Sequence, residues 1–224
     1  MRERRLRAGE PPTDAPCCTT AGLEQLVSPA LAGVFLPHAV TPQDARDVAV
    51  MLRELELQRD MEPGHVRVFP VIDTARGLLR CEDIADAAPR VGGLVFDDDG
   101  YARDVQGRPE ESGPRMAYAR GRVVAAARAF DRLPLAISHG LETRFLAQHG
   151  FAGTVIDEAR LSETANAAFI PSHSTLARAR RHQDAYTAAR AEGAWVARTE
   201  DEIADAHSSR KASQAIEAAG ESEA

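Results

Sequence analysis

Carboxylates follow two apolar segments of the chain at the points where buried strands are expected to end. Asp73 comes directly after Val66–Ile72, and the three acids Asp97–Asp99 come directly after Gly93–Phe96. The intervening residues Ala75–Ala87 have the spacing of an amphipathic helix, so the whole stretch predicts two parallel strands joined by a helical crossover. Functional groups of parallel sheets and barrels lie beyond the carboxyl ends of the strands. We therefore predict a functional site at this edge.

Polar residues also follow the other expected strands, and together they suggest a metal site. His38 follows the first strand, His139 follows the fourth, and Asp157 with Glu158 follows the fifth. A rim of carboxylates and imidazoles is what an oxygen-ligated Mg²⁺ or Mn²⁺ ion would need. For His139 and Asp157 we favour an ordinary loop role. Asp73 lies between two segments that look buried, and we interpret it as functional.

The rest of the chain alternates expected strands with expected helices, which predicts an α/β fold with a parallel sheet. A threonine, a proline and an acid at Thr41, Pro42 and Asp44 mark the start of the helix that follows the first strand. The expected strands are Gly33–Leu36, Val66–Ile72, Gly93–Phe96, Leu133–Ile137 and Gly153–Ile156. Further helices are expected at Gly22–Val27, Pro114–Phe130, Leu141–His149, Ser162–Phe169 and Thr175–Glu192, with one more short strand near Val196.

Composition narrows the classes of function. The net charge of -7 argues against nucleic acid as a partner, and we interpret Arg178, Arg180 and Arg181 as a solvated helix face. No apolar run approaches the roughly 20 residues that span a bilayer, and the basic N-terminus is not followed by the apolar segment of a secretory signal. We therefore expect a cytoplasmic protein without a membrane partner. We expect the Cys81 thiol to pack rather than to react.

Two further reaction classes are disfavoured by what the chain lacks. Its 27 basic residues include a single lysine, Lys211, in a polar segment that looks exposed, whereas a Schiff-base mechanism needs a desolvated lysine. No glycine-rich loop follows the first expected strand, so the dinucleotide-binding signature is absent from the sequence.

Three segments of the sequence match the motifs of one family. IDTARGLL at Ile72–Leu79 resembles the pattern I-E-T-A-R-G-L-L, and Arg90, Val91, Leu94 and Phe96 follow in step. GVFLPHAVTPQDARDVAVML upstream and GFAGTVIDEARLSETANAAFIPS downstream match the patterns G-x-x-L-P-K-x-x-x-x-x-D and G-F-D-G-K-x-x-I-H-P-x-Q-I-x-x-x-N-x-x-F-x-P. The chain thus resembles the HpcH/HpaI aldolase and citrate lyase beta-chain family of CoA-ester lyases over about residues 20 to 195.

The resemblance implies a TIM-barrel-like (β/α) fold, an α/β class, that binds Mg²⁺ through a Glu and an Asp at neighbouring strand ends. It implies carbon-carbon bond cleavage or formation beside a CoA thioester, as in citryl-CoA or malyl-CoA lyases. The substrate would be an acyl-CoA or a small oxo-acid. By position, the resemblance nominates Asp73 and Asp99 as metal ligands and Arg76 as a substrate-binding residue.

The metal motif departs from the family pattern. Asp73 stands where the family has Glu, and the family's second metal Asp aligns with Gly100. The Gly of the family pattern F-G-x-x-D-L aligns with Asp97, and Asp99 would replace the second ligand if the loop shifts. His38 stands where the family has Lys. A degenerate, non-catalytic paralogue that binds a protein partner or acyl-CoA is therefore the alternative to a lyase.

The family has about two more βα units before the part that matches here. We accordingly expect an incomplete barrel that lacks the first one or two units, since closure requires eight strands. Expected boundaries are a disordered leader at residues 1–19, the lyase-like domain at 20–206 and a disordered tail at 207–224. An open sheet edge would favour association, so we expect a homo-oligomer.

Overall fold

A computed structural model describes residues 20–107, 112–137, 143–156, 162–199 and 202–220. These residues divide into two compact units, one within residues 1–168 and the other within residues 169–224, whereas we expected a single domain over residues 20–206. The expected leader at 1–19 lies outside the described residues. No helix in the described ranges is long and apolar enough to cross a bilayer.

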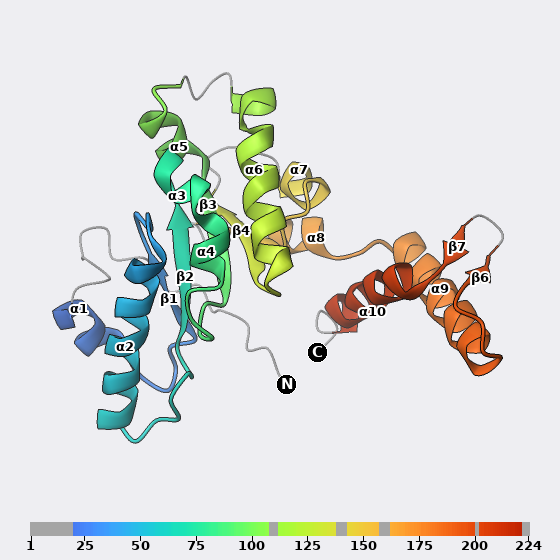
Figure 1. The fold of residues 1–224 in the computed structure, drawn as a ribbon, viewed down its shortest axis with the longest axis horizontal. Coiled ribbons are helices and arrows are strands. Elements are labelled where there is room, and N and C mark those ends of the chain that lie inside the picture. Colours follow the sequence, from blue (N-terminus) through green and yellow to red (C-terminus); the bar gives the residue numbers. More distant parts are fainter. Residues whose placement is uncertain (1–19, 108–111, 138–142, 157–161, 200–201, 221–224) are drawn as a thin grey trace. The chain divides into compact units, whose positions relative to one another are not determined.

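The first unit is built on a parallel sheet of five strands (Figure 1). The strands are β1 (Gly33–Leu36), β2 (Arg67–Ile72), β3 (Gly93–Asp97), β4 (Leu133–Ile137) and β5 (Gly153–Val155). Their order in the sheet is their order along the chain. Each connection therefore steps to the next strand without the reversal of a doubly wound sheet, as in a (β/α) barrel. All five predicted strands are confirmed, with ends that differ by at most one residue.

Helices cover the sheet between the strands. They are α1 (Thr20–Leu26), α2 (Pro42–Gln58), α3 (Ala75–Leu79), α4 (Cys81–Ala85), α5 (Asp98–Asp104), α6 (Ser112–Ala129), α7 (Thr143–Gln148) and α8 (Ser162–Phe169). Helix α2 packs on β2, α4 packs on β3, and α6 packs on β3 and β4 (Figure 1).

Two of these helices differ from the sequence prediction. The single helix expected over Ala75–Ala87 is two short helices, because Arg80 leaves the helical conformation with φ -116° and ψ 11°. Cys81 and Ile84 are fully buried beyond this break, whereas Leu79 before it is exposed. Helix α5 was not expected, and it begins directly after Asp97.

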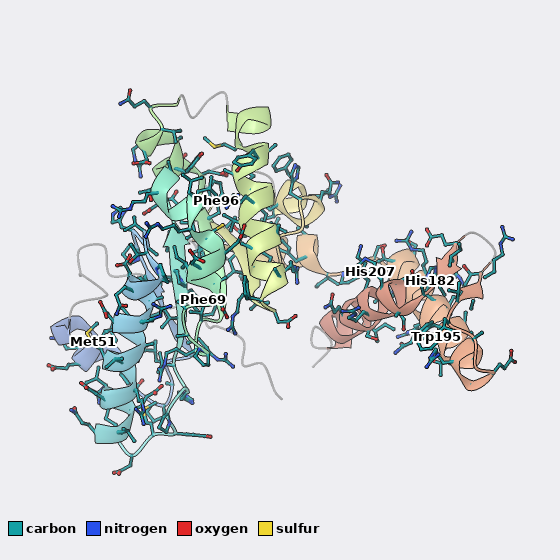
Figure 2. All side chains as sticks on the ribbon, in the orientation of Figure 1. Met51, Phe69, Phe96, His182, Trp195 and His207 are labelled. Atoms are coloured by element: carbon teal, nitrogen blue, oxygen red, sulfur yellow. The ribbon has the colours of Figure 1, made fainter. Side chains whose placement is uncertain are left out.

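Both faces of the sheet are apolar. One face, here called the Val95 face, has Phe69, Val71 and Val95 as its buried core, against which three partly buried side chains pack: Leu135, Ile137 and Val155. The residues that alternate with them include Ile72 and Phe96, which are also fully buried. Figure 2 shows Phe69 and Phe96 on the neighbouring strands β2 and β3. Burial on both faces is typical of a parallel sheet covered by crossover connections.

A buried ion pair joins the end of α2 to the segment before β3. Glu56 is fully buried, and its carboxylate accepts hydrogen bonds from Arg90 Nη1 at 3.2 Å and Nη2 at 2.9 Å. The same carboxylate accepts the backbone N–H groups of Val66 at 2.7 Å and Gly64 at 2.8 Å. Arg90, one of the motif residues, therefore fixes the loop that leads into β2.

The start of α2 is the one that the sequence predicts. Asp44 Oδ2 accepts the backbone N–H groups of Val40 at 2.9 Å and Thr41 at 2.8 Å, and Pro42 is the first helical residue. These bonds satisfy backbone donors that have no partner inside the helix. They also fix the end of the loop between β1 and α2, which carries His38.

The second unit consists of two helices and a small hairpin. Its elements are α9 (His173–Ala191), β6 (Ala197–Arg198), β7 (Ile203–Ala204) and α10 (Ala206–Gly220), with β6 and β7 antiparallel. Helix α10 occupies the segment that we expected to be disordered. It packs along α9 with Ala212 buried, and Asp205 Oδ1 accepts the N–H groups of His207 at 3.0 Å and Ser208 at 2.8 Å. Alanine packing and this N-cap compensate for the low hydrophobicity of the segment.

Candidate functional site

The sheet register places Asp73 beside Asp97. Val71 is paired with Val95, and Ile72 is paired with Phe96, in the parallel ladder of β2 and β3. Asp73 directly follows Ile72, and Asp97 directly follows Phe96. Each lies two residues beyond a member of the Val95 face, and side chains alternate along a strand. Both carboxylates therefore continue that face at the carboxyl edge of the sheet.

His38 binds one oxygen of Asp73. Its Nδ1 lies 2.7 Å from Asp73 Oδ2, and its backbone N–H donates to the same oxygen at 3.3 Å. His38 has a left-handed backbone with φ 53°, which is uncommon for a residue other than glycine. The next residue, Ala39, donates its N–H to Val71 O at 3.2 Å, which ties the loop to β2. The loop thus holds the imidazole over the Asp73 carboxylate.

The second oxygen of Asp73 has no hydrogen-bond partner among the described residues. The residue is 5% exposed, and its Oδ1 is buried without a hydrogen-bond donor among the described residues. Burial raises the pKa of Asp73, and the charge of Asp97 raises it further, while the charge and the backbone N–H of His38 act to lower it. A buried acceptor without a donor is costly, so this atom marks a position where a proton or a cation would be stabilising.

Asp97 caps helix α5 with one oxygen, and its other oxygen lies beside Gly100. Its Oδ1 accepts the backbone N–H groups of Asp99 at 3.1 Å and Gly100 at 3.0 Å. A Cβ atom added to Gly100 would lie 2.7 Å from Asp97 Oδ2 and 2.8 Å from Asp73 Cβ. Asp97 Oδ2 and Asp73 Cβ therefore both lie next to the same point beside Gly100.

The residues nominated by the sequence lie around this pair. Asp99 is partly buried in the first turn of α5. Arg76 is exposed on α3, directly after the strand end at Asp73, and its charge acts on Asp44. His139, Asp157 and Glu158 lie outside the described residues.

Helix α3 is fixed at its start by hydrogen bonds from two directions. Thr74 Oγ1 accepts the N–H of Gly77 at 3.0 Å, and Asp104 Oδ2 accepts the N–H of Ala75 at 2.7 Å. Gly77 lies so close to the β1–α2 loop that an added Cβ would come within 2.5 Å of Ala39 O. Arg76 and His38 are therefore presented by two segments that pack directly on each other.

A buried ion pair anchors helix α5. Arg120 on α6 is fully buried and donates from Nε to Asp98 Oδ1 at 3.0 Å and from Nη2 to Asp98 Oδ2 at 2.9 Å. The guanidinium also lies 5.2 Å from the ring centroid of Phe145. This arrangement gives Arg120 a structural role. It fixes the position of α5, and with it the positions of Asp97, Asp99 and Gly100.

Comparison with known proteins assigns the family. The model of the HpcH/HpaI aldolase/citrate lyase family matches residues 11–155, more than half of the chain. The chain belongs to this family. It is 26% identical over 192 residues to citrate lyase subunit beta of Escherichia coli K12, covering 82% of this chain and 64% of that protein. It is 28% identical over 177 residues to a citrate lyase subunit beta-like protein of Deinococcus radiodurans, covering 75% and 60%. The chain thus spans less than two thirds of the length of these relatives.

Solved structures of this family share the fold. A citrate lyase from Burkholderia xenovorans LB400 superposes with a TM-score of 0.71 at 19% identity, covering 91% of this chain and 68% of that one. Protein CitE from Mycobacterium tuberculosis, solved with magnesium, acetoacetate and coenzyme A, superposes with a TM-score of 0.60 at 23% identity, covering 90% and 83%. The first unit therefore has the TIM-barrel-like (β/α) fold that the sequence predicts.

The carboxylates at the strand ends are chemically suited to Mg²⁺. Mg²⁺ is usually bound by one or two protein carboxylates, with water and substrate oxygens completing its shell. No group of three or more His, Cys, Asp or Glu side chains in the described ranges could hold a metal ion. Asp73 offers Oδ1, which has no hydrogen-bond partner in the part of the chain that the structure describes, and Asp97 offers the oxygen that does not cap α5. This donor set fits Mg²⁺ bound mainly by water and substrate.

Other positions where the chain departs from the family have structural roles here. Thr154 stands at the family's Lys, and its Oγ1 donates to Ala136 O at 3.0 Å, which joins β5 to β4. Cys81 is fully buried, and burial raises the pKa of its thiol, so it packs rather than reacts.

The second unit has a pocket of its own. It measures about 340 Å³ and is lined by residues of α9, α10 and the hairpin, among them Lys211 and His207. Glu202, one of the lining residues, lies 3.1 Å from His182 Nε2 and 3.6 Å from Arg178 Nη1. Figure 2 shows His182 and His207 in this unit. Arg178, Arg180 and Arg181 are exposed on α9, as the sequence predicts.

Proposed function

We propose that the chain is a Mg²⁺-dependent carbon-carbon lyase that acts on a CoA thioester of the citryl-CoA or malyl-CoA class. The observation that carries the proposal is Asp73: a buried carboxylate at the carboxyl end of β2, held by His38 through Oδ2 and unpaired at Oδ1. Family membership supports the reaction class. The presence of magnesium, acetoacetate and coenzyme A in a protein of the same fold supports the ligands.

The residues of the site have separate roles in this proposal. Asp73 and a carboxylate from Asp97–Asp99 hold the cation. The aligned position of the second ligand is Gly100, and Asp99 next to it is the ligand expected from the sequence if the loop shifts. Bound Mg²⁺ would act as a Lewis acid for oxygens of the oxo-acid portion of the substrate. His38 fixes the orientation of Asp73. Arg76, exposed at the same edge, binds an anionic group of the substrate.

The proposed chemistry suits the composition of the chain. Cleavage next to a thioester leaves negative charge on carbon and oxygen, which preorganised cationic groups stabilise. A Schiff base would serve the same purpose, but the only lysine, Lys211, is exposed in the second unit. A metal-assisted mechanism needs no lysine.

A non-catalytic paralogue that binds acyl-CoA or a protein is the second candidate. Gly100, at the position of the family's second metal ligand, favours it, and so does Thr154, whose hydroxyl is used inside the sheet. Such a protein would keep the fold and bind a CoA ester without turnover.

A direct assay separates the two candidates. Purified protein is incubated with citryl-CoA or malyl-CoA and Mg²⁺, and release of acetyl-CoA is followed by chromatography. We expect release that EDTA abolishes and that Asp73→Asn, which matches Asp73 in size, lowers at least about a hundredfold. Asp83→Asn on the exposed side of α4 removes the same charge and should leave the rate unchanged. Tight acyl-CoA binding with no release would favour the paralogue.

We also propose that the protein forms a homo-oligomer. In the described part of the sheet, β5 pairs with β4 alone, so its other side forms an edge of the sheet. Open edges favour pairing with another chain. Size-exclusion chromatography with light scattering tests this proposal, and a monomer at concentrations well above those of the activity assay would contradict it.

A further inference from the structure

We infer that Asp97 supplies the second metal carboxylate in place of residue 100, so that the two positions have exchanged a glycine and an aspartate. This inference rests on the proposed metal site and deepens it. The family pattern F-G-x-x-D has its glycine at the position of Asp97 and its metal ligand at the position of Gly100, as aligned above. In this chain the same segment reads Phe96-Asp97-Asp98-Asp99-Gly100. This segment therefore still supplies one carboxylate for the cation, as it does in the family pattern.

The geometry shows that the two positions compete for one space. An added Cβ at Gly100 would lie 2.7 Å from Asp97 Oδ2 and 3.1 Å from Asp97 Cγ. Contacts below about 3 Å between such atoms force a displacement. The Asp97 carboxylate therefore occupies the space into which a side chain at position 100 would begin. A carboxylate from either position reaches this space, but not from both at once.

The two oxygens of Asp97 have different surroundings. Oδ1 accepts two backbone N–H groups at the start of α5, which is a complete N-cap. Oδ2 lies beside Gly100, where an added Cβ would also approach Asp73 Cβ. The cap alone does not require aspartate, because asparagine and serine cap helices about equally well. Aspartate at position 97 adds a negative charge beside the buried carboxylate of Asp73. Two such charges repel each other unless a cation is bound between them.

The buried oxygen of Asp73 points to the same conclusion independently. Asp73 is only 5% exposed, and its Oδ1 has no hydrogen-bond partner in the described part of the chain. Its other oxygen is already bound by His38. An unpaired buried oxygen next to a second carboxylate is the arrangement expected of a cation site.

The two other acids of the segment are less suitable. Asp98 is bound on both oxygens by the guanidinium of Arg120 and holds α5 in place. Asp99, expected as the second ligand only if the loop shifts, follows in the first turn of the helix, whereas Asp97 is the residue that the sheet register sets next to Asp73.

Metal titration tests the inference without any measurement of catalysis. Mn²⁺ binding to the full chain is followed by electron paramagnetic resonance of the free ion, and Mg²⁺ binding by calorimetry. We expect Asp97→Asn to weaken binding at least about tenfold while thermal melting stays unchanged, since asparagine keeps the cap. Asp99→Asn discriminates between the two candidate ligands and should change affinity less than about twofold. Asp83→Asn is the control for loss of one surface charge.

The exchange itself is tested by reversing it. Asp97→Gly removes both cap and ligand, and Gly100→Asp alone places two side chains in one space, so each single variant should bind metal weakly. The double variant Asp97→Gly/Gly100→Asp restores the order of the family and should recover most of the lost affinity. Such recovery would be a coupling between the two positions that independent sites do not show.

The outcomes separate this inference from the proposed lyase activity. Equal metal affinity in the wild type and Asp97→Asn would overturn the inference, and so would a wild type that binds neither ion. Metal binding that depends on Asp97, in a protein that releases no acetyl-CoA, would uphold the inference and contradict the lyase. Turnover that Asp97→Asn leaves intact would support the lyase activity and contradict the inference.

Discussion

His38 Nδ1 lies 2.7 Å from Asp73 Oδ2, although 80% of the His38 side chain is exposed and only 5% of the Asp73 side chain is. The exposed His38 side chain therefore holds the buried Asp73 carboxylate in position. His38 stands where the family has lysine, and both residues can donate a hydrogen bond to a carboxylate. The interaction leaves Asp73 with one occupied oxygen and one oxygen available for a cation.

Removal of the His38 imidazole should weaken metal binding. Groups that orient a metal ligand typically contribute about ten- to a hundredfold to affinity. We expect His38→Ala to lower Mn²⁺ affinity by that amount, measured by electron paramagnetic resonance. His38→Asn is the control for the backbone, because asparagine tolerates the left-handed φ of this residue better than alanine does. If both variants bind Mn²⁺ like the wild type, the imidazole does not position Asp73.

The Glu56–Arg90 pair should be essential for stability. Arg90→Met leaves the Glu56 carboxylate fully buried without its cation, and loss of one partner of a buried pair typically costs about 3 to 5 kcal/mol. We expect this decrease in the free energy of unfolding by urea titration. Arg53→Met on the exposed face of α2 removes the same functional group and should change stability by less than about 0.5 kcal/mol. Equal effects of the two variants would show that the pair contributes little.

The same carboxylate predicts a dependence of stability on pH. Burial alone would raise the pKa of Glu56, but hydrogen bonds from Arg90, Val66 and Gly64 outweigh it and hold the pKa below its ordinary value of 4.5. A carboxyl group with a lowered folded-state pKa stabilises the fold above its unfolded-state pKa. That contribution is lost as the pH falls through the folded-state value.

The comparison to make is between the wild type and Glu56→Gln. The difference in their free energies of unfolding should be largest near neutral pH and should shrink as the pH falls below 4.5 toward the lowered folded-state pKa, where Glu56 becomes protonated. Urea unfolding between neutral pH and about pH 3 measures it. A difference that is constant over this range would mean that the carboxylate charge is not the stabilising feature.

Local patterns in the sequence were sufficient for most of the first unit. The five strands are short apolar runs bounded by turns, and each was predicted to within one residue at each end. Asp73 was identified because it follows such a run and begins a recognisable motif. The start of α2 was predicted because capping uses neighbouring residues only, namely Thr41, Pro42 and Asp44.

Features that depend on the register or on tertiary contacts were not predicted. The approach of Asp97 to Asp73 follows from the pairing of Val71 with Val95, which no local pattern reveals. A signal for Asp97 was nevertheless present, because an aspartate followed by two acids is typical of an N-cap and a first helical turn. Helix α10 was missed because its alanines become a hydrophobic face only when α9 packs against them.

Two glycines in helices should respond to alanine in opposite directions. Gly77 lies against the β1–α2 loop, where an added Cβ would come within 2.5 Å of Ala39 O, a backbone atom that cannot rotate away. Gly121 lies on the exposed side of α6, where an added Cβ would meet nothing within 4 Å. We expect Gly77→Ala to destabilise the protein by about 1 to 3 kcal/mol and Gly121→Ala to stabilise it by about 0.5 to 1 kcal/mol.

Displacement of the Ala39 backbone should also move the neighbouring His38 away from Asp73. Gly77→Ala is therefore expected to weaken Mn²⁺ binding as well as stability, whereas Gly121→Ala should leave Mn²⁺ affinity unchanged. Urea unfolding and electron paramagnetic resonance on both variants measure the two effects separately. Stabilisation by Gly77→Ala would show that the loop is free to move away from α3. Weakened stability with full Mn²⁺ affinity would instead show that the position of His38 does not depend on this contact.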